Sequence, residues 1–212
     1  MMIGPSESSP RMFENDLFDL FSRTPWYFVP IIWGPVVTLL AWWGYSAGVA
    51  PALLLGQALI GLFVWTFAEY WLHRTLFHWI PDAPWGEKFH FLLHGVHHVW
   101  HKDALRLVMP PGAAVVLYAL FYVGFQGLAY LTAPVANPSW FYGFYAGFTF
   151  GYIVYDVTHY FIHHARVLGT NWFMRQLLVL RKHHLAHHHN PKDAERKFGV
   201  SATLWDHVFG TA

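Results

Sequence analysis

Two short stretches of the sequence repeat one arrangement of histidines. Residues 94–98 read HGVHH and residues 184–188 read HLAHH, so each stretch has three histidines at the spacing i, i+3, i+4. On a helix with about 3.6 residues per turn, this spacing places all three imidazoles on one face. Three converging neutral imidazoles suit a transition metal better than they suit an apolar core. Both stretches therefore predict metal-binding helices.

Two further segments each add a pair of histidines. Residues 69–78 read EYWLHRTLFH, in which His73 and His78 lie about 140° apart on an ideal helix, so we expect the helix to end or bulge there. Residues 155–164 read YDVTHYFIHH, where a pair four residues apart shares one face. One first-row ion takes about six ligands at most, so the total predicts two metal ions. The predicted ligands are His73, His78, His94, His97, His98, His159, His163, His184, His187 and His188.

The composition predicts an all-α integral membrane protein rather than a soluble core. Of the 212 residues, 55% are hydrophobic and only 12% are charged, about half the charge content of ordinary soluble domains. Residues 24–68 and 107–155 contain no Asp, Glu, Lys, Arg or His. Because one crossing needs about 20 apolar residues, each stretch is long enough for a helical hairpin. The expected transmembrane helices cover about 27–48, 52–72, 112–131 and 140–160.

The distribution of positive charge predicts the orientation. All 13 Lys and Arg lie outside the two hairpins, so the positive-inside rule places the N-terminal segment 1–23, the loop 73–110 and a cap 165–212 in the cytosol. We expect a single domain over 1–212, with four helices in the membrane region 24–164. The histidines then form a cytosolic site at the inner membrane of a bacterium or the endoplasmic reticulum of a eukaryote.

Each histidine motif has a plainer interpretation when it is taken alone. His73 or His78 could be an interfacial side chain beside Arg74, and His159 could be a packed core histidine. The run at 184–189 could be a loose metal-scavenging tract. Together, the four segments favour a buried metal site, because ionisable groups at membrane depth usually have a function.

Charge and residue usage exclude several other classes. A net charge of +1 argues against a nucleic-acid partner. The absence of cysteine excludes disulfides, iron–sulfur clusters and thiolate-ligated haem or zinc. Transporters usually place their ligands near mid-membrane on broken helices, whereas these histidines lie at helix ends. A non-catalytic metal-binding or transport protein is therefore the weaker alternative.

Several longer motifs resemble the fatty acid hydroxylase superfamily, and within it most closely the fatty acid 2-hydroxylases. The histidine motifs alone are shared with desaturases and sterol oxidases. The segments RLVMPP (106–111), YDVTHY (155–160) and FGVSATLWD (198–206) are more typical of the 2-hydroxylase branch. The segment FSRTPWYFVP (21–30) is also similar, so the resemblance extends from about residue 14 onward.

This resemblance implies that the same ten histidines bind metal. It also places three residues near the reactive centre, in catalytic roles: Tyr152, Tyr155 and Asp156. Asp156 and Asp103 are further candidates to accept hydrogen bonds from ligating imidazoles. His101, His164 and His189 depart from the family pattern. His189 is rotated by about 100° from His188, so we expect it to point away from the metals.

The predicted activity is oxygen-dependent hydroxylation of a fatty acyl chain at the carbon next to the carbonyl. Two metal ions and dioxygen are the expected cofactor and co-substrate. Zinc has no redox chemistry, so iron is the expected working metal, although zinc can occupy such a site in isolated protein. The sequence contains no segment like the cytochrome haem domain of many eukaryotic relatives. The expected partners are a fatty acyl lipid, membrane lipid, and a separate electron-transfer protein with its reductase. A fatty acyl desaturase or a sterol or carotenoid oxidase remains an alternative, since histidines do not encode where the substrate chain lies.

Overall fold

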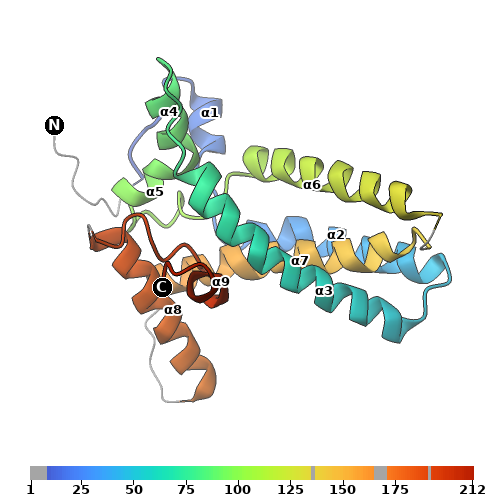
Figure 1. Cartoon of the computed structure of the whole chain (residues 1–212). Helices are drawn as coiled ribbons and strands as arrows, with labels where there is room; N and C mark the ends of the chain where they lie inside the picture. The colour runs from blue at the N-terminus through green and yellow to red at the C-terminus, as the bar shows by residue number, and fades with distance from the viewer. Residues whose placement is uncertain (1–8, 135–136, 165–170, 191) are drawn as a thin grey trace. The chain divides into compact units, whose positions relative to one another are not determined.

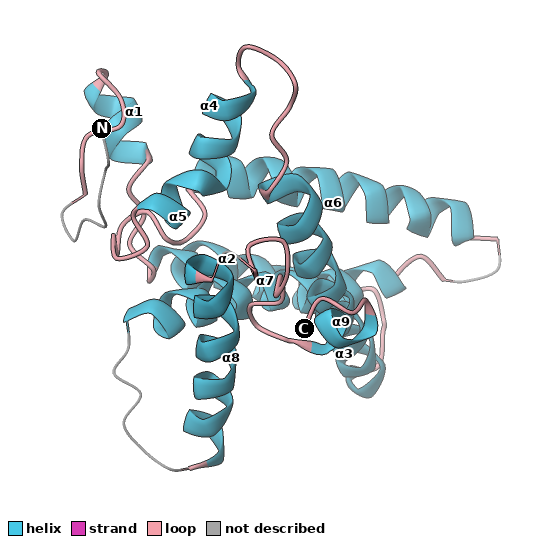
Figure 2. Cartoon of the chain, turned by 60° about the vertical axis from the view of Figure 1, so that its left-hand side comes forward, coloured by secondary structure: helices cyan, strands magenta, loops and turns pink. Residues whose placement is uncertain are grey.

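The computed structural model describes residues 9–134, 137–164, 171–190 and 192–212. These residues form helices joined by loops, without a strand among them (Figures 1 and 2). This confirms the predicted all-α class for the described chain. The elements in chain order are α1 (Asp16–Phe21), α2 (Phe28–Ser46), α3 (Pro51–Trp71), η1 (Leu72–Phe77), α4 (Gly86–His90), η2 (Phe91–Gly95), α5 (Val96–Val99), α6 (Pro111–Thr132), α7 (Trp140–His164), α8 (Trp172–His189) and α9 (Leu204–Val208).

Three helical segments of the described chain are long and apolar enough to cross a membrane. They cover Phe28–Ser46, Pro51–Phe77 and Pro111–Thr132, and they match the first three predicted crossings. The fourth predicted crossing, 140–160, lies within α7, which has 25 residues. Its many Gly, Tyr and Thr residues make α7 less apolar than the other three, so a fourth crossing stays a prediction.

The chain divides into two compact units. The first, which we call the histidine unit, contains Met1–Trp26, Thr66–Pro110 and Tyr155–Ala212. The second, the apolar unit, contains Tyr27–Trp65 and Pro111–Val154. Each of α3 and α7 therefore contributes one end to each unit. Whether the whole chain acts as the expected single domain stays a prediction.

Within the apolar unit, glycines allow α3 and α7 to pack closely. Gly143, Gly147 and Gly151 follow one another at intervals of four residues on α7. A Cβ at Gly147 would overlap the backbone of Ala58, and one at Gly151 would lie 2.5 Å from the Trp65 side chain. Small residues at this spacing are typical of contacts between membrane helices, because they let two backbones approach.

The outward faces of the apolar unit carry large apolar side chains. On α6, Leu120 is 65% exposed and Val123 is 69% exposed. On α2, Ile31 is 62% exposed, as is Leu55 on α3. Many large apolar side chains exposed on long helices are unfavourable in water and indicate contact with lipid or a partner.

The N-terminal part of the histidine unit is fastened to the loop that precedes α6. The backbone N–H of Thr24 donates to the carbonyl of Leu105 at 2.6 Å. Buried Arg106 lies 3.5 Å from the Asp103 carboxylate and 3.4 Å from that of Asp19. Asp19 also accepts from the Met12 N–H at 2.7 Å. Because a buried charge is costly without partners, this network fixes the position of the RLVMPP segment.

Candidate metal centre

Ten histidines of the histidine unit gather in two groups of five. Within each group, one ring nitrogen from every histidine lies within 4.8 Å of the others. The first group consists of His73, His78, His94, His98 and His187. The second group consists of His97, His159, His163, His184 and His188. The structure thus brings together all ten residues that the sequence singles out, in two clusters that could each hold one ion.

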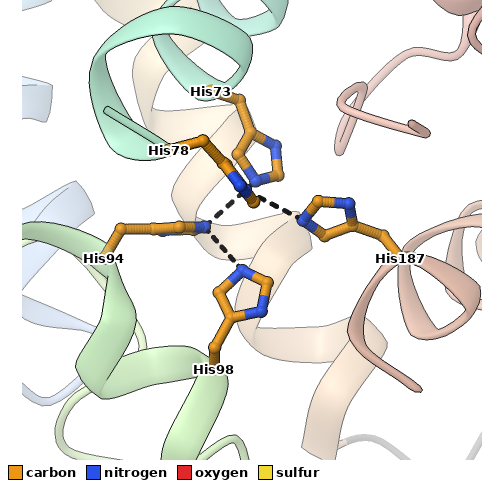
Figure 3. A group of neighbouring side chains, drawn as sticks. All are labelled: His73, His78, His94, His98 and His187. Carbon is orange, nitrogen blue, oxygen red and sulfur yellow. Dashed lines mark hydrogen bonds between the residues drawn. The ribbon is translucent and has the colours of Figure 1, made fainter. Parts of the chain in front are cut away.

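The first group joins three segments of the chain (Figure 3). The Nε2 atom of His94 lies 3.1 Å from that of His73 and 2.9 Å from that of His98. The Nε2 atoms of His78 and His187 are 3.1 Å apart. The five rings point toward a common centre, as ligands of one ion would.

The second group is built in the same way from α5, α7 and α8. The Nε2 atom of His159 lies 3.0 Å from that of His97 and 2.9 Å from that of His184. The Nε2 atoms of His184 and His188 are also 2.9 Å apart. Lone pairs gathered this closely repel one another unless a cation or a proton lies between them, so the donor set fits a bound metal.

A π-helical turn explains how two histidines five residues apart can share a group. The α-helical bonding of α3 changes at η1, where N–H groups bond to carbonyls five residues back, so such residues lie nearly above one another. The rings of His73 and His78 are consequently 5.1 Å apart. The bulge expected from the sequence is therefore present. A second π-helical turn, η2, contains His94.

The helix α8 supplies ligands to both groups. The Asn171 side chain caps its first turn by accepting from the Met174 N–H at 2.9 Å. His187 belongs to the first group, whereas His184 and His188 belong to the second. The i, i+3, i+4 triplet therefore serves two centres, although the sequence suggests a single point of convergence. His189 is exposed and belongs to neither group, in agreement with the expectation that it points away.

Burial keeps the clustered imidazoles neutral. Desolvation, followed by repulsion from neighbouring histidines, lowers the pKa of His78 to about 3 and that of His98 to about 2. The same two causes hold the pKa values of His94, His97 and His184 well below the ordinary histidine value. The neutral form carries the lone pair that a metal needs, so the site is prepared for binding at physiological pH.

The three predicted catalytic residues lie on the middle and C-terminal parts of α7. Tyr152 is buried in the apolar unit, with its ring centroid 5.6 Å from that of Trp33. In the histidine unit, the Tyr155 ring lies 5.8 Å from the His159 ring. The Asp156 carboxylate accepts from the Met109 N–H at 3.2 Å. Roles for these residues in catalysis stay predictions, as does an interaction of Asp156 or Asp103 with a ligating imidazole.

Backbone carbonyls hold two ligands of the first group, and sequence reasoning missed them. The Phe198 carbonyl lies 2.6 Å from Nδ1 of His73. The Arg196 carbonyl lies 2.7 Å from Nδ1 of His187, and the Asp193 carbonyl lies 3.3 Å from the same atom. A carbonyl only accepts, so each Nδ1 carries the proton and each Nε2 lone pair is free for a metal. Backbone acceptors have no residue signature. The FGVSATLWD motif, which contains Phe198, was the available signal.

The comparison with known families decides the assignment. The profile of the family described as fatty acid hydroxylase matches residues 58–211, a range that includes all ten clustered histidines. The chain belongs to the fatty acid hydroxylase family. It is therefore an oxidoreductase of a metal-dependent family, as the sequence predicted, and its two histidine groups provide places for metal.

Individual relatives place the chain within the family. A dihydroceramide fatty acyl 2-hydroxylase of Arabidopsis thaliana is 37% identical over 97% of this chain and 81% of its own length. The ceramide very long chain fatty acid hydroxylase of Saccharomyces cerevisiae is 40% identical over 97% of this chain and 50% of its own. The fatty acid 2-hydroxylase of Homo sapiens is 34% identical, over 95% and 56%. The chain thus spans most of the plant relative and about half of the other two.

A solved structure supports the same assignment. The visible hydroxylase domain of full-length scs7p superimposes with a TM-score of 0.80 at 38% sequence identity. The match covers 94% of this chain and 70% of the other. The predicted similarity to fatty acid 2-hydroxylases is therefore confirmed by both sequence and fold.

Proposed function

We propose that this chain inserts one oxygen atom into a fatty acyl lipid at carbon 2, the position next to the carbonyl. The observation that carries the proposal is the pair of five-histidine groups in a member of this family. The balanced reaction consumes the acyl C–H bond, dioxygen, two electrons and two protons, and it gives the C–OH group and water. The name of the Arabidopsis relative, a dihydroceramide fatty acyl 2-hydroxylase, supports an acyl chain carried by a lipid.

We propose that the ten histidines hold two iron ions, one in each group. Iron supplies the redox chemistry for the use of dioxygen, which zinc lacks. The chain's own part is to keep the imidazoles neutral and aimed inward. Tyr155 and Asp156 precede His159 by about one turn of α7, so we assign them to orienting the substrate head or a nearby proton donor. Tyr152 is proposed to line the path of the acyl chain.

The two electrons must come from outside the histidine groups, since imidazole and carboxylate side chains do not supply them. We propose a separate electron-transfer protein and its reductase as partners. Purified protein loaded with iron should therefore form no hydroxylated lipid until both are added, and sustained turnover without a reductant would contradict this.

The proposed setting is a membrane crossed four times, with the histidine unit on the cytosolic side. All Lys and Arg residues lie outside the two hairpins, which supports this orientation. The membrane would be the inner membrane of a bacterium or the endoplasmic reticulum of a eukaryote. An amphiphilic substrate can then keep its head at the water interface while its tail enters from lipid.

Lipid mass spectrometry of cells that express the chain tests the function. Under labelled dioxygen, acyl chains should gain one labelled oxygen at carbon 2. Cells that express His187→Ala should lack the product, and cells that express His207→Ala should make it. New double bonds without added oxygen would instead assign the chain to the desaturases.

A further inference from the structure

The two histidine groups differ in the hydrogen bonds made by Nδ1, the ring nitrogen opposite the one that faces the group's centre. In the first group, the shortest contacts of Nδ1 of His73 and Nδ1 of His187 are to carbonyls of one short segment, 196–198, and His187 has a longer contact of 3.3 Å to the Asp193 carbonyl. In the second group, Nδ1 of His97, His184 and His188 is buried without a hydrogen-bond partner among the described residues. The segment that begins at Arg196 therefore orients only one of the two centres.

The carboxylate of Asp206 fixes this segment. Asp206 lies on α9 and is fully buried. It accepts from the N–H of Phe198 and from that of Gly199, each at 2.8 Å, and from the Thr211 hydroxyl at 2.8 Å. Its Oδ2 atom is also 3.1 Å from Nε2 of His183 on α8. A carboxylate with this many donors is held in one orientation.

The N–H of Gly199 and the carbonyl of Phe198 belong to the same planar peptide group. Asp206 holds the N–H side of that peptide, and His73 donates to its carbonyl side at 2.6 Å. Fixing one side of a rigid plane fixes the other. Hydrogen bonds in such a chain also polarise one another, which makes the carbonyl a stronger acceptor and the imidazole a better ligand.

Two further observations show that the peptide has little freedom. A Cβ at Gly199 would overlap the Ala202 carbonyl and lie 2.7 Å from Oδ2 of Asp206. On the other side of the turn, the Glu69 carboxylate accepts from the N–H of Ser201 at 2.9 Å. Glu69 is four residues before His73 on the same continuous helical segment. The turn is therefore fastened to α9 and to the segment that carries His73.

We propose that Asp206 is a positioning residue for the first histidine group, acting on His73 through the peptide between Phe198 and Gly199. It sets the metal affinity of that group and leaves the second group unchanged. The inference rests on the proposed function in one respect, that both groups bind metal.

The test is the number of metal ions bound to the full-length protein in detergent, measured with Co²⁺ by elemental analysis and by absorption titration. Asp206→Asn keeps the side-chain size but presents an N–H₂ group to backbone N–H donors. Loss of a partner behind a ligand typically costs about 10–100-fold in metal affinity. Asp206→Asn should therefore lower the affinity for one of the two Co²⁺ ions by this factor. The affinity for the other ion should stay as in the unaltered protein.

Two backgrounds identify the affected group. In His97→Ala protein, which keeps only the first group intact, adding Asp206→Asn should remove most of the remaining ion. In His78→Ala protein, which keeps only the second group, it should change nothing. The matched control is Glu195→Gln, because Glu195 is an exposed carboxylate directly before the segment 196–198 and the exchange removes the same charge. Thr211→Val, which removes one hydrogen bond to Asp206, gives a milder change if Asp206→Asn does not fold.

If folded Asp206→Asn protein binds both ions with equally reduced affinity, or binds both with unchanged affinity, the role of Asp206 is overturned. A different result would overturn the metal centre itself. If the unaltered protein binds no Co²⁺, or if His78→Ala and His97→Ala each leave binding intact, the proposed ligands are wrong, whatever Asp206 does.

Discussion

The rings of His98 and His188 stack with their centroids 4.2 Å apart and an angle of 28° between their planes. His98 belongs to the first group and His188 to the second, so this pair forms a direct contact between the two centres. The two proposed ions are therefore neighbours, each with its own group of five histidines. A reaction that needs two metals acting on one dioxygen molecule is consistent with this arrangement.

Single histidine exchanges should reduce metal binding and activity at the ten clustered positions and leave both intact at the other six. His187→Ala should lower bound metal from about two ions per chain to about one, with loss of hydroxylation by about 100-fold or more, because a group of five loses a ligand. His184→Ala should do the same through the second group. His189→Ala removes an exposed neighbour of His188 and serves as the matched control. Equal damage from His189→Ala in folded protein would show that the assignment of ligands on α8 is wrong.

Acid should destabilise the metal-free protein. Burial lowers the pKa of His78 to about 3 and that of His98 to about 2, whereas both titrate near 6.5 in an unfolded chain. Between these limits the unfolded state binds more protons, so stability falls as the pH drops below about 6.5. Thermal unfolding at pH 5 should occur at least about 5 °C below that at pH 7.5. The double variant His78→Gln, His98→Gln should show a smaller difference in unfolding temperature between the two pH values. The double variant of two exposed histidines, His189→Gln, His207→Gln, should show the same difference as the unaltered protein.

Substitution of glycine by alanine should destabilise the protein at the contact between α3 and α7, but not at an open position on α6. Gly147→Ala should destabilise the protein by about 1–3 kcal/mol, because its Cβ would overlap the Ala58 backbone. Gly124 on α6 has no atom within 4 Å of an added Cβ, so Gly124→Ala should be neutral or slightly stabilising. Thermal unfolding in detergent measures both. A larger loss at Gly124 than at Gly147 would contradict the packing.

The proposed four crossings predict the side on which reporters lie. Reporters fused after Trp100 and after Ala212 should both behave as cytosolic, and one at Asn137 should behave as external. If α7 does not cross the membrane, the reporters at Asn137 and Ala212 will lie on the same side. That result would show that only the three helices identified by length and composition cross the membrane and that α7 does not.

Spacing identified the clustered histidines, because three segments have their imidazoles on one helix face and the fourth needs only the expected bulge to bring His73 and His78 together. It did not reveal how the histidines divide. His97 and His98 are adjacent, so they point about 100° apart on a helix, and adjacent ligands can therefore serve different ions. Which ion each serves depends on the angle between α5 and α8, and local sequence does not encode that angle.

The roles of the carbonyl acceptors and of Asp206 could not be predicted from the sequence, for a different reason. The sequence suggested Asp156 and Asp103 as acceptors, since carboxylates are the visible candidates for this role. In the structure, the acceptors behind His73 and His187 are backbone groups. Any residue type supplies such a carbonyl, and only the fold shows which one faces an imidazole.

The π-helical turn at η1 has a consequence for the phase of the helix. A turn of this kind is equivalent to one residue inserted into an α-helix, and the Thr75 hydroxyl bonds to the Trp71 carbonyl at 2.6 Å within it. Deleting a single residue between His73 and His78 would let the α-helix continue without interruption. The second histidine would then stand four positions after the first, on the same face of the α-helix, and the residues beyond it would keep their orientation. A spacing of five residues with a π-helical turn and a spacing of four residues without one are therefore equivalent ways to place both imidazoles in the same group.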